Sequence, residues 1–115
     1  MRIAFSGHRD RLAPISTLED VCNSYPGAVW VHGGAGGFDT QVETFARSHS
    51  IKTEVIRPNY EKFGKAAPLK RNHAILEGSE LLVACYDGRT SGGTFYTINL
   101  ANKTGLPVRL AGIQK

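Results

Sequence analysis

The chain has 115 residues, of which 41% are hydrophobic and 21% are charged. These proportions are those of an ordinary globular domain, so they exclude a disordered, collagen-like or coiled-coil protein. No apolar run reaches the ~18 residues that a membrane span needs, and polar Ser6 follows the N-terminal apolar segment too soon for a signal peptide. We therefore expect one domain over residues 1–115, a cytoplasmic location and no membrane partner.

Net charge is unevenly placed along the chain. The 14 basic residues exceed the 10 acidic ones, and the excess lies between Lys52 and Arg71. Such a basic face indicates that the protein binds an anion, either a nucleotide phosphate or a nucleic-acid backbone. Cys22 and Cys85 lie in apolar patterns, with no second thiol or histidine at metal-ligand spacing. We expect both thiols to be reduced and buried, with no metal and no further cofactor.

Five short apolar strands alternate with four helices along the chain. In order, we expect a strand at Arg2–Ser6, a helix with Leu18, Val21, Cys22 and Tyr25 on one face, a strand at Ala28–Val31, and a helix with Phe38, Val42, Phe45 and Ala46 facing inward. There follow a strand at Lys52–Arg57, a helix from Pro68 to Gly78, a strand at Leu81–Tyr86, a helix at Ser91–Lys103 closed by Gly105, and a strand at Pro107–Leu110.

This alternation predicts a three-layer, Rossmann-like α/β fold with helices on both faces of a parallel sheet. We expect five strands in the flavodoxin-like order 3-2-1-4-5. Ligands of such sheets bind beyond the carboxyl ends of the strands, where the order reverses.

Two of the four loops at these ends are rich in glycine. The four loops are Ser6–Arg9, His32–Gly37, Arg57–Tyr60 and Asp87–Thr94. The second and fourth hold seven of the 13 glycines, and each precedes a helix whose positive end can attract an anion. The alternative is that the glycines only permit tight turns. Neither loop has the Gly-Lys-Ser/Thr ending of a Walker motif, and Asp39 occupies the place of the third glycine in a dinucleotide fingerprint.

The acidic residues of the second helix suit a sugar better than a phosphate. Asp39 opens that helix, where its charge would repel a phosphate but could accept hydrogen bonds from ribose hydroxyls. Its alternative role is a helix cap. Glu43, one turn further, could instead form a capping box with Thr40 and an ion pair with Arg47.

Hydrogen-bond donors that could bind an anion lie in two other segments of the chain. Ser91–Thr94 offers free amides and two hydroxyls with no acid in the first turn of its helix, and Arg89 lies beside it, so we place a phosphate there. Lys70 and Arg71 fall in the first turn of the third helix, where the dipole disfavours cations. Arg71 could clamp a carboxylate or phosphate bidentately, or lie solvated, and the neighbouring Asn72 could contact a base or ribose.

Several segments together resemble the YspA/YpsA-related branch of the SLOG superfamily: Ser6–Arg9, Val31–Asp39, Gly64–Asn72 and Asp87–Thr94. The resemblance covers nearly the whole chain in the right order. It implies a Rossmann-like, commonly dimeric protein that senses or processes nucleotides. The superfamily includes the LOG phosphoribohydrolases, which cleave the N-glycosidic bond of nucleoside monophosphates, and the DprA proteins, which bind single-stranded DNA.

The match to LOG enzymes is uneven. Arg71 resembles their catalytic arginine, and Ser91–Thr94 resembles a shortened form of their glycine motif, but Thr97 stands where they have a catalytic glutamate. A hydroxyl cannot replace a carboxylate in stabilising an oxocarbenium-like centre. Asp39 or Glu43 could substitute, so the candidate catalytic residues are Arg71, Asp39 and Glu43.

The leading hypothesis is a protein that binds a nucleotide or an ADP-ribose-like ligand, and hydrolysis of an N-glycosidic or phosphoribosyl bond is the first reaction to test. Its alternatives are a single-stranded nucleic-acid-binding module that uses the Lys52–Arg71 face, and a nucleotide sensor without catalysis. A homodimer or higher homo-oligomer is expected. The candidate nucleotide-binding residues are Ser6, Gly7, His8, Arg9, Gly33, Gly34, Ala35, Gly36, Asp39, Arg71, Asn72, Asp87, Arg89, Ser91, Gly92, Gly93 and Thr94.

Overall fold

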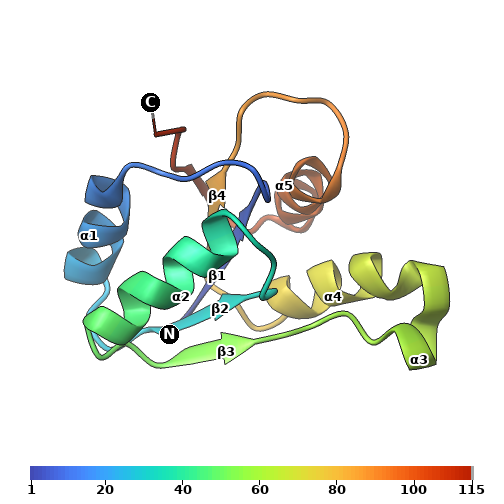
Figure 1. Cartoon of the computed structure of the whole chain (residues 1–115), viewed down its shortest axis with the longest axis horizontal. Helices are drawn as coiled ribbons and strands as arrows, with labels where there is room; N and C mark the ends of the chain where they lie inside the picture. Colours follow the sequence, from blue (N-terminus) through green and yellow to red (C-terminus); the bar gives the residue numbers. More distant parts are fainter. Residues whose placement is uncertain (115) are drawn as a thin grey trace.

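A computed structural model, which describes residues 1–114, contains one five-stranded parallel sheet (Figure 1). The strand order is β3-β2-β1-β4-β5, which confirms the predicted order 3-2-1-4-5. The strands are β1 (Arg2–Gly7), β2 (Val29–His32), β3 (Thr53–Val55), β4 (Leu81–Cys85) and β5 (Val108–Leu110). Each observed strand lies within about two residues of its expected bounds.

Four helices of ten or more residues connect the strands. They are α1 (Ile15–Ser24), α2 (Phe38–Ser48), α4 (Ala67–Leu76) and α5 (Gly93–Thr104). Pro68 is the second residue of α4, where its missing N–H costs no helical hydrogen bond. A short helix α3 (Tyr60–Phe63) and a 3-10 turn η1 (Gly64–Ala66) precede α4 and were not predicted. Because α4 begins at Ala67, Arg71 lies in the second turn of its helix and not in the first, where it was expected.

Each face of the sheet carries its own core. Ile3 and Phe5 of β1 pack on one face with the apolar sides of α1 and α2, whereas Ala4 packs on the other face with α4 and α5. This alternation is the consequence of the two-residue period of a strand. All five residues of β4 are buried, as expected for a strand covered on both faces. No helix within residues 1–114 is long and apolar enough to cross a membrane.

The strand register brings two loops together. β1 and β4 pair in parallel from Ile3 opposite Leu81 to Gly7 opposite Cys85, so they end at the same level. From β1 the chain proceeds to β2 and β3 on one side, and later to β4 and β5 on the other. The loops after β1 and β4 therefore diverge from the point where the strand order reverses, and a crevice is expected between them.

Candidate functional site

A cleft of about 900 Å³ lies at this point of the sheet. Residues from four segments line it: the end of β1 with the loop after it, the start of α2 with the loop before it, α4, and the first half of α5 with part of the loop after β4. The lining residues are Phe5, Ser6, Gly7, His8, Arg9, Asp10, Ala35, Asp39, Pro68, Leu69, Arg71, Asn72, Ile75, Arg89, Gly92, Gly93, Thr94, Phe95, Tyr96 and Asn99. The cleft thus joins segments that are far apart in the sequence.

Asp39 contributes a buried carboxyl group to the cleft. The residue is 6% exposed, and its Oδ2 accepts a hydrogen bond of 3.1 Å from the Ala35 amide. Its Oδ1 is buried and has no hydrogen-bond partner among the described residues. Burial raises the pKa of Asp39 above its ordinary value, against the opposing effects of the Ala35 and Gly33 amides, His32 and Arg71. Buried polar atoms without a partner are rare, so this oxygen is available to a donor from water or from a ligand.

The Arg71 guanidinium lies beside this carboxyl and is half-buried. Its Nη1 donates to the Gly33 carbonyl at 3.0 Å and its Nε donates to Asn72 Oδ1 at 3.1 Å. Burial lowers the pKa of Arg71 and the Asp39 carboxylate opposes this change, yet a guanidinium stays charged in proteins. Within residues 1–114, Nη2 donates to no protein acceptor. Asp39 and Arg71 therefore present a free acceptor and a free donor in the same cleft.

Two glycines of the loop after β2 make room for arginine side chains. A Cβ atom at Gly33 would overlap Arg71 Nη1, and one at Gly34, where φ is +73°, would come within 2.7 Å of Arg57 Nη1. Arg57 Nη1 also donates to the Gly34 carbonyl at 3.2 Å. Neither glycine lines the cleft. The two glycines therefore lie close to the side chains of Arg71 and Arg57, and neither of them contacts the cleft.

A buried histidine, His32, holds the backbone of the same loop by a hydrogen bond. His32 Nδ1 accepts a hydrogen bond of 3.0 Å from the Gly34 amide, so the ring proton is on Nε2, which donates to Glu43 Oε1 at 2.7 Å. Glu43 Oε2 accepts from Arg47 at 2.9 Å and from Thr53 at 3.2 Å. These bonds, led by that of His32, lower the pKa of Glu43.

This arrangement changes the interpretation of Glu43. The residue does not line the cleft, and both its oxygens are occupied, which argues against the catalytic role that the sequence suggested. The alternative ion pair with Arg47 is confirmed. The capping box with Thr40 is wrong, because α2 begins at Phe38 and the Thr40 hydroxyl donates to the Ala35 carbonyl.

The N-terminus of α5 faces the cleft through Gly92, Gly93 and Thr94. Gly92 precedes the helix with φ +94°, and no acidic residue lies in the first turn. The first amides of a helix lack partners within it and carry the positive end of the dipole. Thr97 is buried and its hydroxyl donates to the Gly93 carbonyl at 2.8 Å, so it lines no part of the cleft.

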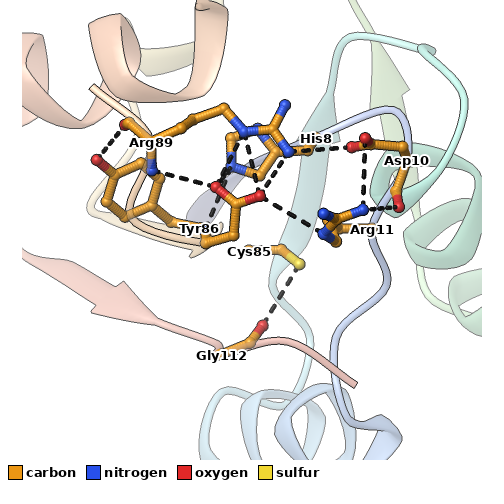
Figure 2. A network of polar contacts seen from close by, with 8 residues as sticks. His8, Asp10, Arg11, Cys85, Tyr86, Arg89 and Gly112 are labelled. Atoms are coloured by element: carbon orange, nitrogen blue, oxygen red, sulfur yellow. Dashed lines mark hydrogen bonds and ion pairs between the residues drawn. The ribbon is translucent and has the colours of Figure 1, made fainter. Parts of the chain in front are cut away.

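An ion-pair network holds the loop after β4 at the rim of the cleft (Figure 2). Arg89 Nε lies 2.9 Å from Asp87 Oδ1, and Arg89 Nη2 lies 2.5 Å from Asp87 Oδ2 and 3.3 Å from Asp10 Oδ1. Arg89 thereby keeps the pKa of Asp87 far below its ordinary value. Arg11 Nε lies 3.5 Å from the same carboxylate. Arg89, which was expected to hold a phosphate, is therefore engaged by two carboxylates.

His8 and Cys85 are both buried, His8 within this network and Cys85 next to it. His8 Nε2 lies 3.1 Å from Asp87 Oδ1 and 3.3 Å from the Asp87 amide nitrogen, and burial lowers the pKa of the imidazole. The Cys85 thiol donates to the Gly112 carbonyl, as Figure 2 shows, and burial raises its pKa to about 11. A thiol of this kind is a poor nucleophile. Residues 1–114 contain no group of three or more histidine, cysteine or acidic side chains that could hold a metal ion.

Most of the residues predicted from the sequence gather in the cleft. Those that line it are Ser6, Gly7, His8, Arg9, Ala35, Asp39, Arg71, Asn72, Arg89, Gly92, Gly93 and Thr94, whereas Gly33, Gly34, Gly36, Glu43, Asp87 and Ser91 do not. Sequence reasoning missed the apolar wall formed by Leu69, Ile75, Phe95 and Tyr96. Helical spacing could have found part of it, since Ile75 lies one turn beyond Arg71 on α4.

Comparison with known proteins is consistent with this architecture. The model of the YspA, cpYpsA-related SLOG family matches residues 1–63, slightly more than half of the chain. The chain belongs to the YspA, cpYpsA-related SLOG family. The matched part of this SLOG domain runs from β1 through α3 and includes Asp39, while Arg71 and the start of α5 lie beyond it. The chain is 32% identical over 117 residues to the Gene 61 protein of Mycobacterium phage D29, with 93% of each protein covered. No solved structure gives a significant match.

Proposed function

We propose that this SLOG protein binds a nucleotide or an ADP-ribose-like ligand in the cleft. The observation that carries the proposal is the buried Asp39 Oδ1, which lacks a partner among the described residues and lies in one cleft with the Arg71 guanidinium and the N-terminus of α5. The ligand must therefore offer hydrogen-bond donors at one place and an anionic group at another. A phosphorylated ribonucleoside has both.

The phosphate fits best at the N-terminus of α5. Gly92 and Gly93 carry no side chains that would keep an anion from the amides, and Thr94 adds a hydroxyl. Arg89 can join the phosphate only by leaving Asp87 and Asp10, so its contribution is reduced by the carboxylates that it already binds.

The ribose fits best beside Asp39. Its hydroxyls can donate to Oδ1 and accept from the free Nη2 of Arg71, which satisfies both groups at once. A hydrogen bond to a charged group contributes about 1.5–3 kcal/mol. The apolar wall of Leu69, Ile75, Phe95 and Tyr96 then offers a surface for a base.

Isothermal titration calorimetry with mononucleotides, cyclic nucleotides, NAD and ADP-ribose tests this proposal. We expect at least one of them to bind, and Asp39→Asn and Arg71→Gln to weaken that binding. Asp20→Asn is a matched control, because Asp20 is exposed and pairs with Arg109 away from the cleft. Failure of the whole panel, or equal weakening by the control, would contradict the proposal.

We further propose hydrolysis of an N-glycosidic bond at this site, because the Asp39 carboxylate lies where we place the ribose. The carboxylate can take a proton from the water that adds to the anomeric carbon of the sugar and pass it to the departing base. The products would be a free base and a phosphorylated sugar. Chromatography of nucleoside monophosphates incubated with the protein should show base release that Asp39→Asn abolishes. Binding without any release would identify a sensor without catalysis.

A further inference from the structure

The segment Asn59–Ala66, here called the arm, contributes no residue to either core. It contains α3 and η1, and all eight of its residues are exposed. Figure 1 shows α3 at one end of the long axis of the molecule, next to the N-terminal end of α4. Burial in the domain therefore does not explain the two large aromatic side chains of the arm, Tyr60 and Phe63.

The arm exposes two aromatic rings next to lysines. Tyr60 is 58% exposed and Phe63 is 37% exposed. The Nζ atoms of Lys62 and Lys70 lie 5.2 Å and 5.8 Å from the centre of the Phe63 ring, which is within the range of a cation–π contact. Flat rings and ammonium groups therefore occur side by side on an open surface.

The charges of this region are also unbalanced. Residues 57–71 include five basic side chains and one acidic side chain, Glu61. Within residues 1–114, the ion pairs of the protein involve arginines and histidines, and none involves Lys62, Lys65 or Lys70. Among the described residues no carboxylate pairs with these lysines, so their charges are available to an anion, unlike that of Arg89, which carboxylates already engage.

We propose that the arm is a contact surface for single-stranded nucleic acid. Proteins that bind single strands combine cations that follow the backbone with aromatic rings on which unpaired bases stack, and the arm supplies both within eight residues. A duplex offers the phosphates but keeps its bases stacked on each other, so it gains nothing from the two rings. The contact surface is separate from the nucleotide cleft and does not depend on the function proposed for that cleft.

Fluorescence anisotropy with a labelled oligothymidylate tests this inference. We expect the logarithm of the association constant to fall with the logarithm of salt concentration, since three lysines on single-stranded phosphates give a slope of about −2. The double variant Lys62→Ala/Lys65→Ala should reduce the magnitude of that slope by about 1.4. The double variant Tyr60→Ala/Phe63→Ala should weaken binding at least about fivefold, through lost stacking, and leave the slope unchanged.

Matched controls separate a specific surface from general attraction to a basic protein. Lys52→Ala/Lys103→Ala removes the same charge from two exposed positions outside the arm, and we expect it to change neither slope nor affinity. Equal loss in both lysine variants, equal affinity for a duplex, or no binding at low salt would overturn the inference. Because every substituted residue is exposed, we expect each variant to fold, and circular dichroism of each variant verifies this.

Discussion

Replacement of Asp39 by asparagine separates ligand binding from stability more sharply than any other single substitution. The carbonyl of the introduced amide can still accept the hydrogen bond from the Ala35 amide, while an NH2 group takes the place of the unpartnered Oδ1. A hydrogen bond to a charged acceptor contributes about 1.5–3 kcal/mol and a neutral one about 0.5–1.5 kcal/mol. The difference of about 1–2 kcal/mol predicts roughly five- to thirtyfold weaker ligand binding.

Stability should change in the opposite direction. Because burial raises the pKa of Asp39 in the folded protein, the native state holds this proton more tightly than the unfolded chain does. Stability of the native protein is therefore lost as pH rises from the unfolded value, near 3.8, through the higher folded pKa. The side-chain amide of the variant cannot ionise, so Asp39→Asn should be at least as stable as the native protein near neutral pH, and its relative advantage should shrink in acid.

Thermal unfolding across this pH range, combined with calorimetry of the best ligand, measures both effects. A variant that unfolds more easily at neutral pH but binds the ligand with unchanged affinity would refute the reasoning. Asp39 would then serve only to cap the helix, and the ligand would not bind its Oδ1.

Three further substitutions or reactions test the packing around the site. Gly7→Ala should lower the free energy of unfolding by about 1–3 kcal/mol in urea titration, because its Cβ would lie 2.5 Å from the Phe38 side chain. Gly105→Ala should cost about 1 kcal/mol by the same assay through backbone strain alone, since φ is +79° and no atom lies within 4 Å of the added Cβ. Cys85 should resist alkylation in the native protein until the pH approaches its pKa of about 11, and rapid labelling near neutral pH would show that the thiol is accessible.

The fold was largely predictable from the sequence because its strongest signals are local. The apolar run of β4 and the helical spacing of Phe38, Val42 and Phe45 each describe a buried face, and the strict alternation of the elements leaves few topologies. The helix α3 escaped prediction because none of its residues is buried, so it shows no apolar period.

The candidate site was predictable only in part. The glycine loops stood out by composition and Arg71 by position. The hydrogen-bond and ion-pair partners of each side chain, however, depend on tertiary contacts that no local pattern encodes. The sequence suggested Glu43 for catalysis, whereas the packing of α2 on the sheet brings Glu43 into hydrogen bonds with His32 of β2 and Thr53 of β3. The same limit applies to Arg89, whose partner Asp10 lies 79 residues away in the chain.

The most direct test of the account is the effect of ADP-ribose or a mononucleotide on the backbone amide resonances of the protein. Shifts should concentrate at Ala35, Gly92, Gly93 and Thr94, where we place the sugar and the phosphate, and Asp39→Asn should diminish those at Ala35. Shifts confined to the arm, or to α1 and the C-terminal half of α2, would contradict a nucleotide site at the carboxyl ends of β1 and β4.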